Sequence, residues 1–140
     1  LAYNLDNGMI LSGNYNFIND TQTISRETRE TNGEIGTSRP QNRYKFSLNH
    51  PRAFNNNLGY SLTGRYSDKY WFDSFLWYGV AEVGGNFNID AQVSYILKEY
   101  NMLLKMGVNN LLGQYYNTSV LTPQIGSTIY LSLEYDQLIK

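Results

Sequence analysis

The chain has 140 residues and a net charge of -1, with 13 Tyr, 6 Phe, 2 Trp and 12 Gly but no Cys, and only 16% of its residues are charged. The lack of cysteine excludes a disulfide framework and a thiolate metal site, and the near-neutral charge argues against nucleic acid as a partner. No run approaches the roughly 18 consecutive apolar residues of a transmembrane helix. The length suffices for one domain with a core, and the composition is typical of a β-rich chain.

The first strand expected in chain order is short, from Leu1 to Leu5, and it ends at the tight-turn sequence Asp6-Asn7-Gly8. The chain begins without Met and without a signal peptide, within what its pattern indicates to be a strand. We therefore expect a processed product or a piece of a longer protein.

Six further stretches alternate apolar with polar side chains at a period of two, as strands do. In the last of them, for example, Ile129, Leu131 and Leu133 alternate with Ser132 and Glu134. The alternation predicts an all-β fold, an antiparallel up-and-down meander of six to seven strands. The six clear strands are expected near residues 9 to 18, 43 to 49, 58 to 67, 86 to 97, 102 to 112 and 126 to 136.

The connections between these strands are alternately short and long. A soluble sandwich has no reason to sort its connections by length, whereas an outer-membrane barrel has short periplasmic turns and long extracellular loops. The pattern therefore favours a transmembrane β-barrel. The shorter connections are 6 to 8, 50 to 57 and 98 to 101, and the longer ones are 19 to 42, 67 to 85 and 113 to 125.

The two faces of the strands support the same architecture. Charged side chains gather on the polar face, which suits a water-filled lumen better than a packed interior, so the apolar face would contact outer-membrane lipid. Tyr and Phe near the strand ends fit interfacial aromatic girdles. The expected lumen-facing charges are Lys45, Arg65, Asp90, Lys105 and Glu134, and the expected girdle residues are Tyr15, Phe17, Tyr44, Tyr66, Tyr95 and Tyr135.

Two pairs of these charges are expected to meet. Parity places Lys105 and Glu134 on the same face of the sheet. A register that pairs Met106 with Leu133 would set the two charges opposite each other, and such a pair stabilises a sheet. A second, diagonal pair is expected between Arg65 and Asp90.

The stretch VNNLLGQYY, residues 108 to 116, resembles the penultimate-strand signature of TonB-dependent outer-membrane transporters, a Val-x-Asn-Leu-aromatic-Asp run followed by Tyr. Asn110, Leu111 and Tyr116 match this signature, and Leu112 and Gly113 depart from it. We expect Leu111 and Leu112 to pack at the rim of the barrel. The order of the segments GNYNF, RPQNRYKFSL, LTGRYSDKYW, NIDAQVSYIL and GSTIYLSLEYD also resembles that family's C-terminal barrel, so the resemblance covers nearly the whole chain.

The resemblance implies a barrel of about 22 strands around a plug domain, of which this chain would be the last third, without the plug. Closure would be obligatory, because each unpaired backbone group in lipid costs several kcal/mol. The implied function is a wall segment of an active transporter in the Gram-negative outer membrane, taking up a scarce solute such as an iron chelate, cobalamin or an oligosaccharide. The implied partners are outer-membrane lipid, the rest of the barrel with its plug, and an energy-coupling periplasmic protein. The residues after Tyr135 depart from the terminal aromatic of that family.

Catalytic chemistry has little support in the sequence. His50 is the only histidine and precedes Pro51, so we expect it in a turn, where no Ser-His-Asp arrangement can be built. The carboxylates in residues 25 to 34 are interleaved with arginines, which indicates a solvated loop rather than a calcium site. We therefore expect no enzyme, no metal and no cofactor.

A cluster of aromatic side chains in the long connection 67 to 85 is the best candidate for ligand binding. Exposed aromatic rings in an extracellular loop can stack on a sugar or an aromatic chelate. Some of them are expected to be only girdle or loop-packing residues. The candidates are Tyr70, Trp71, Trp77 and Tyr78.

Two other classes of protein fit the alternation. A small complete outer-membrane barrel, acting as an adhesin or a lipid-binding protein, would need an eighth strand and a full first strand. A soluble carbohydrate-binding β-sandwich would need the apolar faces to meet and bury each other. The larger barrel instead predicts accessible side chains at Leu104, Met106, Val108, Ile129, Leu131 and Leu133.

Overall fold

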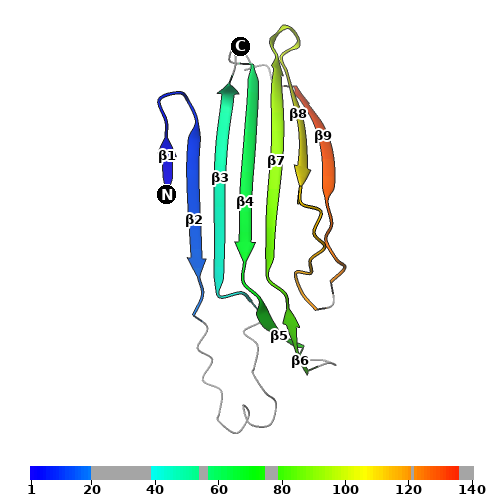
Figure 1. The fold of residues 1–140 in the computed structure, drawn as a ribbon. Coiled ribbons are helices and arrows are strands. Elements are labelled where there is room, and N and C mark those ends of the chain that lie inside the picture. Colours follow the sequence, from blue (N-terminus) through cyan, green and yellow to red (C-terminus); the bar gives the residue numbers. More distant parts are fainter. Residues whose placement is uncertain (20–38, 54–56, 75–78, 121, 136–140) are drawn as a thin grey trace.

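The computed structural model describes residues 1–19, 39–53, 57–74, 79–120 and 122–135. These residues are all-β apart from one 3-10 turn, and their main sheet has seven strands in the order β1-β2-β3-β4-β7-β8-β9 (Figure 1). Every pair of neighbours is antiparallel, so the predicted up-and-down meander is confirmed. The strand bounds are β1 Ala2–Asn4, β2 Ile10–Phe17, β3 Asn42–Ala53, β4 Leu58–Ser67, β7 Asn86–Leu97, β8 Met102–Asn109 and β9 Thr128–Tyr135.

The alternation in the sequence becomes a set of continuous rows across the sheet. Facing residues present their side chains to the same face of the sheet, so in most rows apolar side chains stand opposite apolar ones and polar opposite polar. The meander therefore has one apolar face and one polar face. One apolar row runs through Tyr3, Leu11, Leu48, Leu62, Ala91, Val108 and Ile129.

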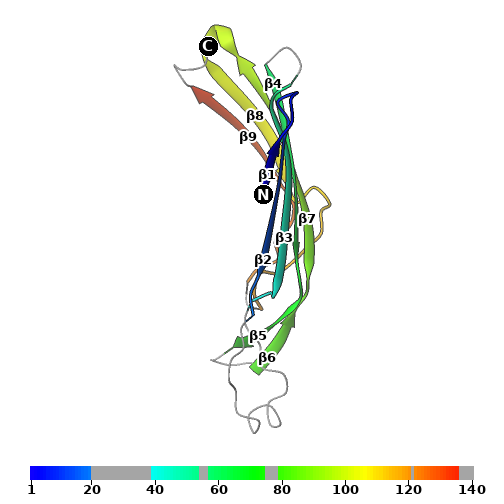
Figure 2. The same cartoon turned by 90° about the vertical axis from the view of Figure 1, so that its left-hand side faces the viewer.

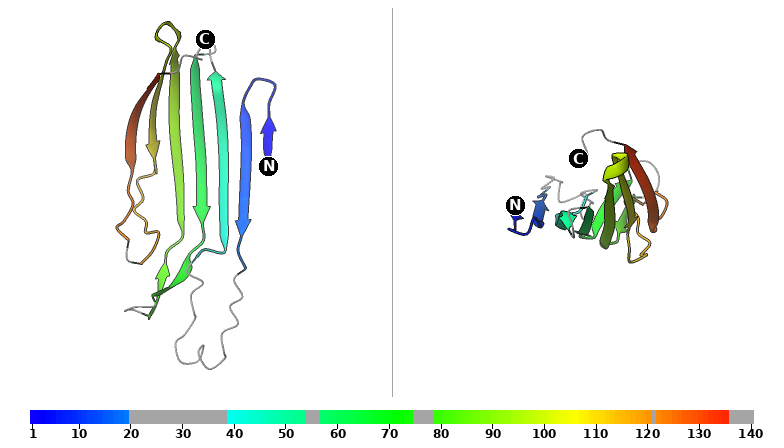
Figure 3. Two further views of the ribbon diagram at one scale, coloured as in Figure 1. Left: turned by 180° about the vertical axis from the view of Figure 1, so that it is seen from behind. Right: turned by 90° about the horizontal axis from the view of Figure 1, so that it is seen from above.

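The main sheet is a single curved layer. Seen along its edge it is thin and bent (Figure 2), and seen from its end the strands follow an open arc (Figure 3). The strands β1 and β9 form the two edges and do not pair with each other. None of the described residues belongs to a helix with the length and apolar character needed to cross a membrane.

Short and long connections lie at opposite ends of the sheet (Figure 1). The turns that join β1 to β2, β3 to β4 and β7 to β8 form what we call the turn end, and the longer connections form the loop end. At the turn end, Gly8 has a φ of 83° and Asn101 a φ of 52°. Gly and Asn are the residues that adopt this left-handed conformation most readily, which is why the chain can reverse there.

The sequence predicts a loop between β4 and β7, and this prediction is wrong in part. The connection contains a separate antiparallel sheet of two strands, β5 (Tyr70–Ser74) and β6 (Gly79–Val83). The hairpin lies beyond the loop end of the main sheet (Figure 1). Its first strand places aromatic side chains at consecutive positions, so no alternation of polar and apolar residues marks it as a strand.

The sequence also places His50 and Pro51 in a connection, whereas both lie within β3. The register between β3 and β4 shifts between His50 and Ala53, so this end of β3 is irregular. Proline has no N–H to donate to a ladder, and an irregular strand end tolerates it. The last two strands are shorter than predicted, because β8 ends at Asn109 and β9 begins at Thr128.

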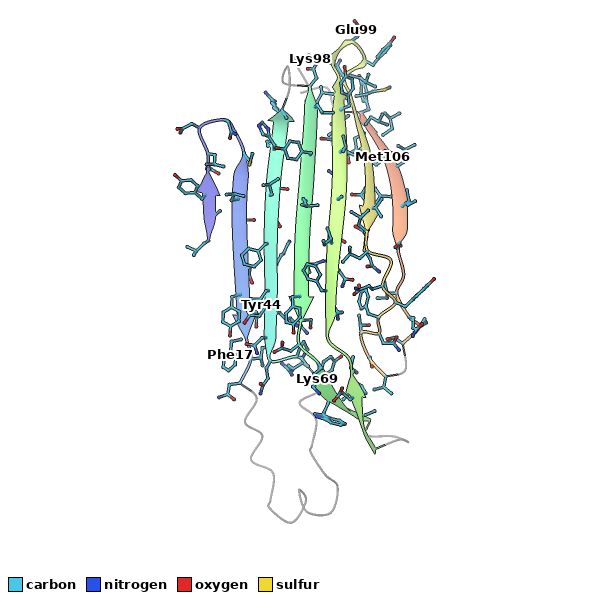
Figure 4. The ribbon with its side chains drawn as sticks, viewed as in Figure 1. Phe17, Tyr44, Lys69, Lys98, Glu99 and Met106 are labelled. Atoms are coloured by element: carbon cyan, nitrogen blue, oxygen red, sulfur yellow. The ribbon has the colours of Figure 1, made fainter. Side chains whose placement is uncertain are left out.

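Few side chains of the described residues are buried, in either the main sheet or the β5–β6 hairpin. Among the described residues, Ala53 and Val83 are the buried apolar ones. The six apolar residues predicted to be accessible are so: Val108 is partly exposed, and the exposed fractions of the other five range from 36% at Leu104 to 76% at Ile129. In the described part of the chain no second layer covers either face, so these residues form no sandwich (Figures 2 and 4).

Candidate binding surface on the polar face

The polar face carries the charges that the sequence predicts for it. In the observed registers Lys45, Arg65, Asp90 and Lys105 fall on polar rows, and Glu134 lies on the same face of the sheet, opposite Leu103. Lys45 and Arg65 lie toward the loop end of the sheet, whereas Lys105 and Glu134 lie toward the turn end. Strand parity alone suffices for this placement, because a strand can present each side chain to only two faces.

The predicted ion pair between Lys105 and Glu134 forms, with Nζ and Oε1 2.6 Å apart. The predicted register is wrong by two residues, because Met106 pairs with Leu131 and Lys105 faces Ser132. A slip of two residues keeps every side chain on its face, so the alternation cannot distinguish the two registers. The pair is therefore diagonal, and the length of the lysine side chain bridges the offset.

Arg65 and Asp90 form the diagonal pair that the sequence predicts, with a guanidinium nitrogen 2.6 Å from Oδ2. The other carboxylate oxygen, Oδ1, accepts a hydrogen bond of 2.9 Å from the backbone N–H of Asn110. Asp90 thereby links β4, β7 and the point at which the chain leaves β8. Only 20% of its side chain is exposed, so both bonds lie in a partly desolvated position.

The exit from β8 turns on Asn110, which is 2% exposed and has a φ of 54°. The Nδ2 of Asn110 donates to the carbonyl of Gln114 at 2.7 Å, and the carbonyl of Asn110 accepts a hydrogen bond of 2.6 Å from the hydroxyl of Ser127. Asparagine is suited to this left-handed turn. Leu111 and Leu112, which the sequence predicts to pack at the rim, follow this turn and are both about half exposed.

Three cationic side chains lie together at the loop end of the polar face. Lys45 of β3 directly faces Arg65 of β4, and Arg43 is diagonal to Arg65 because it faces Ser67. Like charges at facing positions destabilise a sheet. Asp90 offsets Arg65, and no carboxylate among the described residues forms an ion pair with Arg43 or Lys45. We call Arg43, Lys45 and Arg65 the cation cluster.

The cation cluster borders a hollow of about 370 Å³. The hollow lies between the polar face, β5 and the segment that follows β8. No carboxylate of the described residues lines it, so its charge is positive and attracts anions. Its lining includes Arg43, Lys45, Arg65, Tyr70, Asn88 and Thr118.

Of the four predicted aromatic ligand residues, the structure places Tyr70 at this hollow. Its hydroxyl donates to the carbonyl of Thr118, which ties β5 to the segment after β8. Burial raises the pKa of Tyr70 above its ordinary value and the nearby Arg43 lowers it, with burial the larger influence, so the hydroxyl stays protonated at neutral pH. Trp71 does not line the hollow, and Trp77 and Tyr78 lie outside the described residues.

Asn88 supplies a buried polar group to the same hollow. It is 3% exposed, and its Nδ2 donates to Oδ1 of Asn86 at 3.0 Å. Its Oδ1 has no hydrogen-bond partner among the described residues, a condition that it shares with Oδ1 of Asn110 and that is uncommon for a buried oxygen. Sequence reasoning missed both Asn88 and Arg43 as site residues, because each occupies an ordinary polar position of the alternation. Only the register brings them beside Arg65.

The chain matches no family model, no curated protein and no solved structure. The described residues also contain no group of three or more His, Cys, Asp or Glu that could hold a metal ion.

Proposed function

We propose that this chain is a wall segment of an outer-membrane active transporter, of the TonB-dependent receptor type, with no catalytic role of its own. The observation that carries the proposal is the apolar face, on which a single-layer meander exposes large apolar and aromatic side chains from β2 to β9. Soluble proteins rarely expose contiguous apolar patches larger than a few hundred Å². Lipid would cover this face without a second layer of protein.

The aromatic side chains support a membrane boundary at the loop end. Tyr15, Tyr44, Tyr66 and Phe87 form one row across four strands. The rings of Tyr15 and Tyr44 stack with their centroids 4.8 Å apart, and the hydroxyl of Tyr15 donates to Oδ1 of Asn42 at 2.8 Å. A ring that is apolar on its body and hydrogen-bonded at its tip suits the interface between lipid and water.

The two edge strands support membership in a larger barrel. β1 has three residues and β9 has eight, and each pairs on one side only. In lipid, the unpaired N–H and C=O groups of such edges would cost several kcal/mol each. In this proposal further strands pair with both edges and close a barrel of about 22 strands around a plug domain.

The polar face would line the lumen, where the ion pairs Arg65–Asp90 and Lys105–Glu134 are compatible with water. A scarce solute such as an iron chelate, cobalamin or an oligosaccharide would pass along this wall. Energy would come from the inner membrane through a periplasmic coupling protein that acts on the plug. The resemblance of residues 108 to 116 to the family signature supports this proposal, as do the order and spacing of the other segments.

The full-length gene product in its own cells is the material for the test. We expect it to sediment with the outer-membrane fraction, to require detergent for extraction, and to migrate faster in gel electrophoresis before heating than after it. Uptake of radiolabelled iron chelate, cobalamin or oligosaccharide should require both the gene and an energised inner membrane. Dissipating the proton gradient should abolish that uptake.

Three results would contradict the proposal. Release of the gene product into water without detergent would favour a soluble protein in which other parts of the full-length chain cover the apolar face. A closed barrel of eight strands, built from this chain with little addition, would favour an adhesin or a lipid-binding protein. If the gene product lies in the outer membrane but uptake does not depend on the proton gradient, the barrel assignment stands and the assignment of active transport fails.

A further inference from the structure

We propose that the hollow at the loop end of the polar face binds the acidic part of a hydroxyl-bearing solute, such as a uronic-acid unit. The carboxylate would lie among the side chains of the cation cluster, at the end of the sheet where Tyr44 and Lys69 are labelled in Figure 4. This inference deepens the proposed function by naming a substrate class. It rests on that function only for the placement of the polar face in water.

The positive charges around the hollow exceed the negative ones among the described residues. In the part of the chain that the structure describes, three cations border the hollow, and the one carboxylate that pairs with them is Asp90, the partner of Arg65. The nearby Asp68 does not line the hollow, and its Oδ2 accepts a hydrogen bond from Nδ2 of Asn42 on the apolar side of the sheet. Lys45 and Arg65 therefore face each other with no described anion beside the lysine. A bound anion would offset this repulsion.

The side chains of the cation cluster are accessible to a ligand from solvent. Arg43 and Lys45 are exposed, and 47% of the Arg65 side chain is exposed although it is paired. Their donors can reach a group that enters the hollow without any rearrangement of the strands. Arginine presents paired N–H groups that match the two oxygens of a carboxylate, and hydrogen bonds between charged partners are stronger than neutral ones.

Asn88 adds a hydrogen-bond acceptor to the lining of the hollow. Its unpartnered Oδ1 is buried and cannot be satisfied by a second anion, because an oxygen acceptor needs a donor. A hydroxyl group of the ligand would supply that donor. Anion and hydroxyl on one small ligand are the combination found in an acidic sugar, whereas sulfate has no proton to donate to this oxygen at neutral pH.

The size of the hollow limits how much of a ligand it can hold. A volume of about 370 Å³ is near the lower end of the range for small-molecule sites. One acidic sugar unit is of this scale, and a whole metal chelate is larger. We infer that the hollow recognises one unit of a longer acidic glycan. A lipid headgroup is excluded as the source of the anion, because the cation cluster lies on the face opposite to the apolar one.

The test uses the purified full-length gene product in detergent and a matched pair of probes, D-glucuronate and D-glucose, which differ by a carboxylate. Calorimetric titration should detect binding of glucuronate and much weaker binding of glucose, and added salt should weaken glucuronate binding. Arg43→Gln and Lys45→Gln should each lower the affinity for glucuronate by about tenfold or more. Lys105→Gln is the matched control, because Lys105 lies on the same face outside the hollow. This variant should bind glucuronate with the same affinity as the wild type.

Equal binding of glucuronate and glucose would overturn the inference. So would unchanged glucuronate affinity in Arg43→Gln and Lys45→Gln, including the case in which these variants alter only the stability of the barrel. Asn88→Asp places a negative charge where the amide was and should weaken the binding of glucuronate. The heat-dependent change in electrophoretic mobility checks that this variant is folded.

The outcomes for the inference and for the proposed function are separable. If glucuronate binds through the cation cluster but the protein is extracted without detergent, the site stands and the transporter proposal fails. If the protein is an energised outer-membrane transporter and the cluster variants bind glucuronate as the wild type does, the transporter proposal stands and the site fails.

Discussion

The hydroxyl of Tyr130 on β9 donates a hydrogen bond of 2.8 Å to Oε1 of Gln92 on β7, across the strand that lies between them. Gly107 of β8 faces both residues in the same row. A Cβ added at Gly107 would collide with the ring and the hydroxyl of Tyr130. The ring therefore lies over the glycine, and the bond between the two outer strands is possible because the middle one has no side chain there.

Gly107→Ala should lower the free energy of unfolding of the full-length protein in detergent by about 1–3 kcal/mol, because the added methyl forces the Tyr130 ring aside. Urea titration followed by gel mobility measures the change. Gly84→Ala is the matched control, since nothing lies within 4 Å of a Cβ built at Gly84, and its effect should stay within about 0.5 kcal/mol. In a Tyr130→Ala background the alanine at 107 should cost much less. Equal costs in both backgrounds would show that the ring and the glycine are not coupled.

Two carboxylates on the polar face should differ in their importance for stability. Asp90→Ala removes the partner of Arg65 and leaves the backbone N–H of Asn110 without an acceptor, so we expect a loss of about 1–3 kcal/mol. Glu134→Ala removes one exposed ion pair and should cost at most about 1 kcal/mol. Urea unfolding of both variants checks the order, and a larger loss for Glu134→Ala would refute the linking role of Asp90.

Two lysines on the polar face should respond in opposite directions to the same substitution. Lys45→Gln relieves repulsion with the facing Arg65 and should raise the free energy of unfolding, by up to about 1 kcal/mol at low salt. Lys105→Gln removes the pair with Glu134 and should lower it. Both effects should shrink as salt is added, because these side chains are in contact with water. Changes of the same sign in the two variants would contradict the charge arrangement described for this face.

The strands and their faces could be predicted from the sequence because both depend on parity alone. The alternation around Leu131 and Leu133 fixes which side chains share a face, whatever the register. The register depends on which row of one strand meets which row of the next, and a slip of two residues leaves the pattern unchanged. For this reason Met106 pairs with Leu131 rather than with Leu133, although the predicted contact between Lys105 and Glu134 still forms.

The candidate site was harder to predict because it depends on register and on elements without alternation. The repulsive pair of Lys45 and Arg65 exists only in the observed pairing of β3 with β4. Tyr70 reaches the hollow because residues 70–74 form a strand that no polar–apolar period marks. The sequence predicts that β3 ends before Pro51, because proline usually marks a connection. In the structure Pro51 lies within the irregular end of β3.

The central claim is that the apolar face meets lipid and the polar face meets water, and adjacent residues of β9 test it directly. The chain has no Cys, so single cysteines at Leu131 and Ser132 can be labelled with a fluorophore in the full-length protein, with any cysteines outside this chain replaced, after reconstitution in vesicles. Leu131 is 71% exposed on the apolar face, and Ser132 lies on the polar face. Nitroxide-bearing lipid should quench the label at Leu131→Cys and not that at Ser132→Cys, while aqueous iodide should do the reverse. Quenching of the label at position 131 by iodide, or by neither agent, would contradict the account.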